Sequence, residues 1–223
     1  MDRESENLFS YILMELGETK LYGKFRITIV NRRTYQKQLS LEDKNIGNRE
    51  RKILCKLLYR FCPVGIDNGF VEGSFFVLLD DKLIKVGFDK IFRLEESSQL
   101  SRLQLNIGGK EKRKLSKAYS NYPLVVEFKA NKNSIRIKRV SNRGKSVKRQ
   151  NIKCYPIFED ICFDVFDKLE VIGIDQKISM SGTIIIYLCN DVVSFNGKVK
   201  GYNNIPRYVY FKNWGLEERG TKR

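Results

Sequence analysis

The sequence contains no histidine and no long apolar run. Histidine is the most frequent general base and metal ligand near neutral pH, so its absence excludes Ser-His and Cys-His catalysis and histidine-ligated metals. The longest apolar run, residues 183–189, has the length of a strand and is far shorter than the roughly 18–20 residues that span a bilayer. The acidic first residues do not resemble a signal peptide, so we expect a chain that is neither secreted nor membrane-spanning.

Paired cysteine motifs are also missing. The chain has five cysteines, an odd number, and none of them are spaced as Cys-x-x-Cys. Cys55 and Cys62 lie seven residues apart, which on a helix is two turns or roughly 10 Å and is too far for a disulfide or a shared metal. We expect reduced, mostly buried thiols in a protein of the cytoplasm or nucleus.

Acidic residues are nearly absent from one part of the chain. Residues 134–153 contain eight Lys or Arg and no acid, and residues 110–153 contain 15 Lys or Arg against Glu111 and Glu127, a net charge of +13. The rest of the chain has 27 Lys or Arg and 24 acids, or +3 of the total +16. The excess charge is therefore local, and such a segment attracts polyanions, either nucleic acid or an anionic lipid surface.

What is present indicates a folded chain. Hydrophobic residues make up 42% of the 223 residues, enough to bury a core. We expect one α+β domain over residues 1–223, with a mostly antiparallel sheet and about three helices. Residues 108–114 are interpreted as a polar, basic connection. The expected helices are residues 5–17, capped by Ser5 and Gly17, 48–63 and 157–169, and the expected strands are 20–30, 34–41, 70–79, 82–94, 123–130, 134–140, 147–155 and 207–212, with two more joined by a turn at Asn196 and Gly197.

The stretch at residues 134–153 alternates like a strand of a β-hairpin, with Ile135 and Ile137 on one face and Arg136 and Lys138 on the other. Such a hairpin would project most of its cations from one surface. Like charges across a hairpin are destabilising unless an anion offsets them, which favours an anion-binding surface over a merely solvated one. The predicted site, made of positioning charges and not of base readers, is Lys112, Arg113, Lys114, Arg136, Lys138, Arg139, Arg143, Lys145, Lys148 and Arg149.

Four aromatic residues interleave with the basic segment: Tyr119, Tyr122, Phe128 and Tyr155. Aromatic platforms beside cations bind single strands, but tyrosines on strands more often belong to a core or its rim. No RNP-type signature or helix-turn-helix is present, so sequence-specific readout is not expected. RNA, DNA and lipid all remain open as the anion.

A second basic stripe is predicted on the helix at residues 48–63. Arg49, Lys52, Lys56 and Arg60 recur on one side of this helix, opposite its apolar stripe. The stripe is either an ordinary solvated face or a helix face laid against phosphates or lipid headgroups.

One short motif leaves an enzymatic alternative. Glu127 and Lys129 fall on the same side of a strand, as in the Glu-x-Lys half of PD-(D/E)xK nucleases. In such an enzyme the carboxylate holds Mg²⁺ and the lysine assists the attacking water. The same pair is also common on the solvent face of ordinary strands, and no Pro-Asp precedes it nearby.

The order of elements resembles a matrix protein of the rhabdovirus type. The resemblance rests on LYGKFRITIV at residues 21–30, the apolar helix at residues 48–61 and SGTIIIYL at residues 181–188, and it covers most of the chain. The four prolines form no proline-rich budding motif, which departs from that family. The resemblance implies a protein that binds ribonucleoprotein and anionic membrane and that self-associates under a viral envelope.

The sequence thus predicts a non-enzymatic basic protein that binds nucleic acid or ribonucleoprotein, with an anionic membrane surface and a second copy of itself as further partners. No cofactor or metal is expected. The expected location is intracellular, or a virion if the matrix-like role holds.

Overall fold

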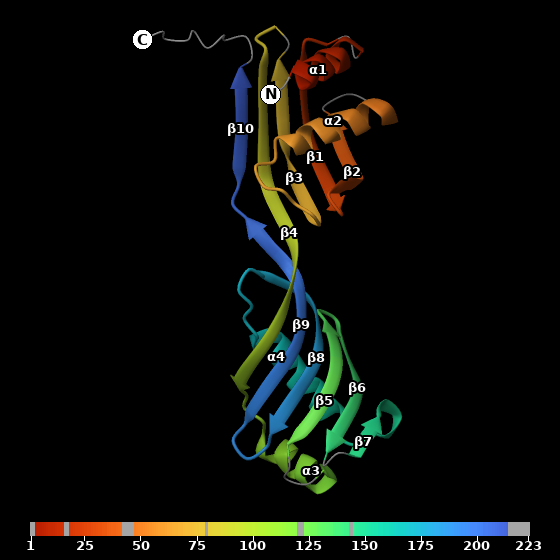
Figure 1. Cartoon of the computed structure of the whole chain (residues 1–223), viewed down its shortest axis with the longest axis vertical. Coiled ribbons are helices and arrows are strands. Elements are labelled where there is room, and N and C mark those ends of the chain that lie inside the picture. The colour runs from red at the N-terminus through yellow and green to blue at the C-terminus, as the bar shows by residue number, and fades with distance from the viewer. Residues whose placement is uncertain are drawn as a thin grey trace, which may run out of the picture. The chain divides into compact units, whose positions relative to one another are not determined.

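A computed structural model describes residues 3–15, 18–41, 47–78, 80–119, 123–142 and 145–213 (Figure 1). The chain is an α+β fold with a mostly antiparallel sheet, as predicted. Contacts divide it into two compact units: the first unit is Met1–Leu94 with Asn204–Arg223, and the second unit is Glu95–Asn203. The strands β4 (Leu83–Gln104) and β9 (Val192–Ile205) both continue from one unit into the other. Whether the chain unfolds as the single domain that we expected stays a prediction.

The sheet of the first unit is antiparallel, in the order β2-β1-β3-β4-β10, and two helices accompany it. Alternation along β1 buries Leu21, Phe25, Ile27 and Ile29, and leaves the residues between them on the other face. Both helices pack on the buried face. The elements are α1 (Arg3–Glu15), β1 (Lys20–Val30), β2 (Arg33–Leu41), α2 (Asn48–Arg60), β3 (Gly69–Leu78), the first part of β4, and β10 (Tyr208–Asn213).

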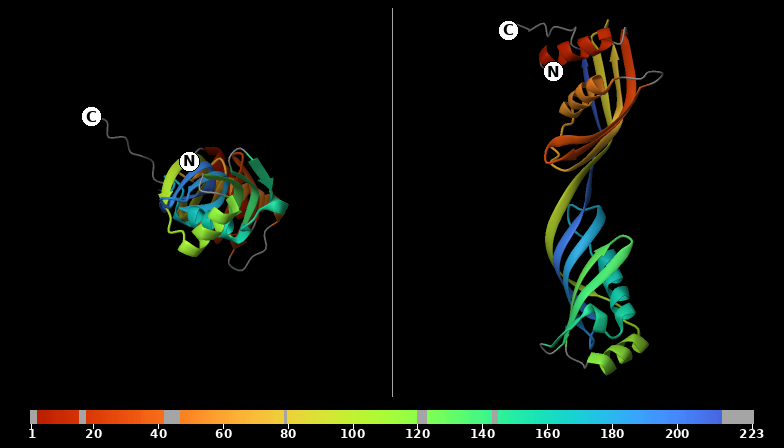
Figure 2. Two further views of the ribbon diagram at one scale, coloured as in Figure 1. Left: turned by 90° about the horizontal axis from the view of Figure 1, so that it is seen from below. Right: turned by 90° about the vertical axis from the view of Figure 1, so that its right-hand side faces the viewer.

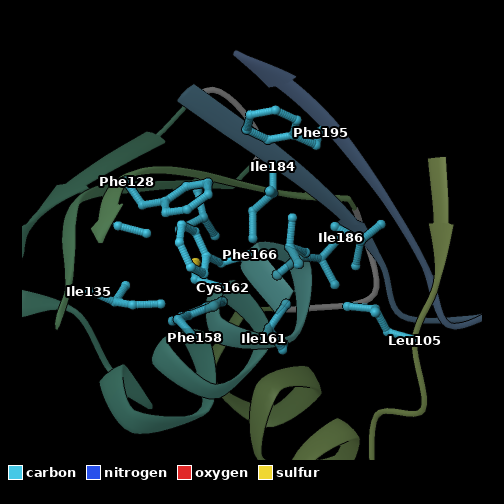
Figure 3. Close-up of a cluster of buried hydrophobic side chains, with 14 of the residues drawn as sticks. Leu105, Phe128, Ile135, Phe158, Ile161, Cys162, Phe166, Ile184, Ile186 and Phe195 are labelled. Carbon is cyan, nitrogen blue, oxygen red and sulfur yellow. The ribbon is translucent and has the colours of Figure 1, made fainter. Parts of the chain in front are cut away.

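The sheet of the second unit has the order β4-β9-β8-β5-β6-β7. Figure 2 shows α4 beside β5 and β6, and Figure 3 shows Phe158, Cys162 and Phe166 of this helix pointing toward the sheet. One face of the sheet is therefore the core face, and we call the opposite one its outer face. The elements are α3 (Gly109–Tyr119), β5 (Leu124–Asn131), β6 (Ser134–Asn142), β7 (Lys145–Lys148), the 3-10 helix η1 (Arg149–Asn151), α4 (Tyr155–Lys168), β8 (Gln176–Tyr187) and β9.

Two sequence predictions about local structure were wrong. Residues 109–119 form α3 where a polar connection was expected, because Leu115 and Tyr119 bury one side of that charged segment. Asn196 and Gly197 lie inside β9 and not at a turn. Gly197 is the direct partner of Gly182 on β8, and a Cβ on Gly197 would stand 2.8 Å from the ring of Phe195. The same Cβ would clash with the Ser181 carbonyl oxygen and stand 2.7 Å from the Gly182 Cα, so this glycine chiefly permits the close approach of the facing strand β8.

Several boundaries also moved. The described chain has four α-helices where about three were expected. Ser5 lies within α1 and does not cap it, while Gly17 lies outside the described residues. The strand that returns after β6 ends at Lys148, and α4 begins at Tyr155.

Candidate anion-binding surface of the second unit

A row of basic residues crosses the outer face of the second unit's sheet. The backbone register pairs Lys198 of β9 with Ser181 of β8, Ser181 with Lys129 of β5, and Lys129 with Arg136 of β6. Directly paired residues share a face, so these four side chains line up across four adjacent strands. We call Lys198, Ser181, Lys129 and Arg136 the basic row.

Two members of the basic row are cations without a counter-charge. Lys129 and Arg136 are exposed and directly opposite each other, and neither has a hydrogen bond or ion pair with any described residue. Like charges directly opposite on neighbouring strands are destabilising, so the row favours an external anion. Lys198 donates to Glu96 at 2.9 Å, which lowers the pKa of that carboxyl.

Hydroxyl and amide groups surround the cations. The next row pairs Lys200 with Ser179, Ser179 with Asn131, and Asn131 with Ser134. These side chains are short and uncharged apart from the exposed Lys200. They leave the cations accessible and offer hydrogen-bond donors to phosphate oxygens.

At a β-bulge beside the basic row, one acidic residue forms ion pairs with two of the predicted cations. Glu127 pairs with Arg139 and its neighbour Phe128 with Ile137, so Lys138 is the extra residue. Lys138 Nζ lies 3.2 Å from Glu127 Oε1, and Arg139 donates to Oε2 at 2.9 Å. The hydrogen bond from Lys138 is the main cause that lowers the pKa of Glu127. Lys138 and Arg139 are thus partly neutralised, unlike Arg136.

The three predicted cations of α3 differ among themselves. Lys112 forms an ion pair with Asp191 and is not a free positive charge. Arg113 is exposed and its Nε donates to the Gly109 carbonyl at 3.1 Å, while Lys114 is exposed. A hollow of about 420 Å³ lies beside this helix, lined by Lys112, Arg113, Ser116, Lys117, Leu188 and Cys189.

Two of the cations after β6, Lys145 and Lys153, do not share a surface with Arg136. Lys145 pairs with Asn142 on the core side of the β6–β7 ladder, opposite in phase to Arg139 and Lys148. Lys145 and Lys153 line a hollow of about 480 Å³ beside Tyr119 of α3. The hairpin therefore does not project Lys145 and Lys153 from the surface of Arg136, and the expectation that it projects most of its cations from one surface stays a prediction. Arg143 lies outside the described residues, as does the side chain of Lys148.

The aromatic residues of the basic segment mostly belong to the core. Phe128 is fully buried, and Tyr119 is buried with its hydroxyl donating to the Lys153 carbonyl at 2.9 Å. The half-buried hydroxyl of Tyr155 accepts the amide of Ile137, and Arg149 lies 6.0 Å from the Tyr155 ring. This confirms the core interpretation for Tyr119 and Phe128. Tyr122 lies outside the described residues.

Sequence reasoning missed Lys198 and Lys200. They lie about sixty residues from Arg136 and join its surface only through the strand order β9-β8-β5-β6. The sequence did contain a signal for a strand with both lysines on one face, because they flank the buried Val199 in a period-two pattern.

The secondary basic stripe forms as predicted, in the first unit. Arg49, Lys52, Lys56 and Arg60 are all exposed on α2, while Leu54, Leu57 and Leu58 of the same helix are buried. The structure therefore does not bring this stripe onto the outer face of the second unit's sheet.

The pair proposed for nuclease chemistry shares a face as expected. Glu127 and Lys129 both lie on the outer face of β5, but the carboxylate oxygens of Glu127 each accept from a cation. Among the described residues no group of three or more acidic or thiol side chains could hold a metal ion. The geometry thus assigns Glu127 to charge balance within the bulge.

The five cysteines are free thiols. Cys55 and Cys162 are buried, Cys62 and Cys154 are half-buried, and Cys189 is exposed. Burial raises the pKa of Cys55 to about 11 and also raises the pKa of Cys162. None of the helices in the described ranges has the length and apolar character needed to cross a membrane.

Comparison of the chain with protein-family models, with curated proteins and with solved structures finds no match.

Proposed function

We propose that this protein is a non-enzymatic, basic protein that binds an anionic polymer, nucleic acid or ribonucleoprotein, through the outer face of the second unit's sheet. The observation that carries the proposal is the basic row, where Lys129 and Arg136 lie side by side without a counter-charge among the described residues. A polyphosphate backbone supplies closely spaced negative charges that offset this repulsion.

The expected recognition is of the backbone and not of base sequence. Lysine, arginine, serine and asparagine side chains on a flat sheet contact phosphate oxygens, which positions a nucleic acid without reading it. Ser181 lies between Lys198 and Lys129 of the neighbouring strands, and Ser179, which pairs with Lys200, extends the same surface. Affinity should therefore depend strongly on salt.

The test is binding to single-stranded RNA, duplex DNA and anionic liposomes across a salt series. The variant Lys129→Ala/Arg136→Ala removes the two cations that lack a partner. Each phosphate contact on a single strand contributes about −0.7 to the log–log slope, so losing two lowers the slope by about 1.4 and weakens binding about 25-fold at roughly 0.1 M salt.

The matched control is Lys168→Ala/Arg207→Ala, which removes the same charge from residues that do not belong to the basic row. Lys168 lies on α4 and Arg207 in the first unit, and both are exposed. Equal losses in both variants would show that only net charge matters and would overturn the assignment to the basic row. No binding of the unmodified protein to any of the three ligands would overturn the function itself.

Two further outcomes concern the wider role. A matrix-like protein would bind the liposomes as well and would self-associate, which sedimentation at increasing protein concentration measures. Mg²⁺-dependent loss of the RNA or DNA, abolished by Glu127→Ala, would replace this proposal with the nuclease alternative.

A further inference from the structure

The outer face of the first unit's sheet carries aromatic rings and a lysine in one row. Tyr22 of β1 pairs with Phe76 of β3, Phe76 with Lys85 of β4, and Lys85 with Phe211 of β10. These four residues share the face opposite the helices α1 and α2, whose side chains pack into the core on the other side. We call them the aromatic row.

The aromatic row is open at both ends. Phe211 is 63% exposed, Tyr22 is 38% exposed, and Val209, on the same side of β10 as Phe211, is 56% exposed. Single exposed apolar residues are ordinary, but rings at both ends of one cross-strand row are not scattered singly. They form an apolar strip across the outer face of this sheet.

Cations flank the aromatic row, and they have no partner within the described chain. Lys20 and Lys24 lie on either side of Tyr22 along β1, on the same face, and Lys85 lies within the row. All three are exposed and form no hydrogen bond or ion pair with a described residue. In a strand, same-face neighbours are about 7 Å apart and adjacent strands about 4.8 Å, so each ring has a cation within reach of one nucleotide.

In the adjacent part of the same face, the charged side chains form ion pairs with one another. Glu72 pairs with Arg26 at 2.7 Å and with Lys90 at 2.9 Å. The Arg26 guanidinium also lies 4.7 Å from the Phe70 ring, which stacks on Phe92. The contrast separates a network of paired charges from the aromatic row, whose rings and lysines find no such partners among the residues that the structure describes.

We propose that the aromatic row stacks unpaired bases, so that the polymer bound by this protein is a single-stranded nucleic acid. The inference rests on the proposed function and names its substrate class. Exposed rings beside cations accept bases in any sequence, because every base has a π face and every nucleotide has a phosphate. Burial of this face against a second copy is disfavoured, since a two-fold contact would bring Lys24 and Lys85 toward the same lysines of the partner.

The experiment compares an oligothymidine strand with an abasic strand of equal length, which keeps the phosphates and lacks the bases. The unmodified protein should bind the base-bearing strand more tightly. Tyr22→Ala/Phe211→Ala should lose at least about fivefold in affinity per ring for that strand and leave abasic binding nearly unchanged. Lys129→Ala/Arg136→Ala should weaken both strands alike.

Three variants separate stacking from other causes. Phe163→Ala removes an aromatic residue of α4 that is 42% exposed, and should change neither affinity. Phe211→Trp should retain the preference for the base-bearing strand, whereas Phe211→Leu, which stays apolar, should lose it.

The possible outcomes distinguish base stacking from the proposed function. Equal binding of both strands, unaffected by Tyr22→Ala/Phe211→Ala, would overturn base stacking and leave the proposed function standing. Retention of the preference in Phe211→Leu, or binding of duplex DNA as tight as that of oligothymidine, would also overturn it. Failure to bind both strands and duplex DNA would overturn the proposed function, whereas binding of duplex DNA alone would overturn base stacking only. Liposome binding that depends on Phe211 without strand binding would assign the row to a membrane surface and overturn both.

Discussion

The two units share one construction and differ in the chemistry of the outer sheet face. In each, an antiparallel sheet buries one face under helices and leaves the other face to solvent. The first unit places Tyr22, Phe76 and Phe211 there among lysines, while the second places Lys129, Arg136 and short hydroxyl residues. On one face of a sheet, residues stand about 5 Å apart across strands and about 7 Å apart along a strand. The side chains at these positions then determine which ligand the face can bind.

The comparison predicts that the basic row contacts the phosphates of a bound strand and that the aromatic row stacks its bases. The affinity that comes from phosphate contacts falls with salt concentration, and the affinity that comes from base stacking does not follow salt in the same way. The salt series should therefore separate the contributions of the two outer faces to binding.

The largest effect should follow from removing a core ring of one unit. Phe158 is fully buried in the second unit and meets Tyr119 edge-on at 5.6 Å. Phe158→Ala should lower the free energy of unfolding by about 3–5 kcal/mol, because it loses apolar burial and leaves a cavity. Urea unfolding monitored by labelling of Cys55 and Cys162, one buried thiol in each core, measures this for each unit separately.

The same labelling tests the expectation of a single domain. One cooperative domain predicts that both thiols become reactive at the same urea concentration and that Phe158→Ala shifts both transitions. Phe75→Ala, a fully buried ring of the first unit, is the matched change and should give the same joint shift. A shift of Cys162 alone in Phe158→Ala would show that the units unfold independently.

The second effect concerns the bulge on the second unit's outer face. Glu127→Gln should release Lys138 and Arg139 for the polymer, because the neutral amide no longer balances their charge. The salt slope for single strands should steepen by up to about 1.4, and affinity at roughly 0.1 M salt should rise by up to about 25-fold. Fluorescence anisotropy with labelled RNA measures both.

The pKa of Glu127 gives the same prediction for the unmodified protein. Its ion pairs keep this pKa below the ordinary value of 4.5, so the carboxylate remains charged until the pH falls through that lowered value. Binding should therefore tighten only at strongly acidic pH, while the stabilising ion pairs are lost over the same range. Glu96→Gln, which releases Lys198 alone, should give about half the effect. An unchanged slope in Glu127→Gln would show that Lys138 and Arg139 do not reach the polymer.

The third effect concerns how helices end in the two units. In α2 the backbone amides that follow the helix donate to the carbonyls of Leu58 and Tyr59 in its last turn. In α4 the amide of Leu169 closes the helix on Val165, and a lysine of β8 serves further carbonyls at the same end. Lys177 Nζ donates to the carbonyls of Phe166, of Asp167 at 2.7 Å and of Leu169 at 2.8 Å. Lys177→Met should lower the free energy of unfolding by about 1–2 kcal/mol, because the carbonyls lose a cationic donor.

Desolvation limits this third effect, since burial lowers the pKa of Lys177 and offsets part of the gain. Lys168→Met is the matched control, because Lys168 lies on the exposed side of α4, 3.7 Å from Asp164. Its effect should be within about 0.5 kcal/mol of zero. Equal effects of the two substitutions would contradict the capping role of Lys177.

The sequence predicted those elements whose hydrophobic period is unbroken. Strand β1 and the helices α2 and α4 follow the expected pattern closely. Helix α3 was missed because its period rests on Leu115 and Tyr119 amid dense charge after two glycines. The Asn196-Gly197 pair was misread because the turn signal is local, while the need for Gly197 comes from the facing strand.

The candidate sites show the same limit more strongly. Charge density singled out Arg136, Lys138 and Arg139 alike, but it could not show that a bulge pairs Lys138 and Arg139 with Glu127. The aromatic row joins β1, β3, β4 and β10, whose residues lie up to about 190 positions apart, and only the register aligns them. Register across strands that are distant in sequence carries no local signal.

The smallest effect should come from the buried thiol of the first unit. The pKa of Cys55 rises from its ordinary value of 9.0 to about 11 on burial, so between these values the unfolded chain ionises this thiol and the folded chain does not. The folded state then binds more protons, and stability falls as the pH rises through this window. By about pH 9.5 the loss from Cys55 should approach, but not exceed, about 1 kcal/mol.

Cys55→Ala should flatten the decline measured by urea unfolding between pH 8 and 9.5, although the lost side chain lowers stability at every pH. Cys189→Ala, which removes an exposed thiol, is the matched control and should keep the full decline. Identical pH dependence in Cys55→Ala and Cys189→Ala would mean that Cys55 ionises in the folded protein and would contradict its burial in the core of the first unit.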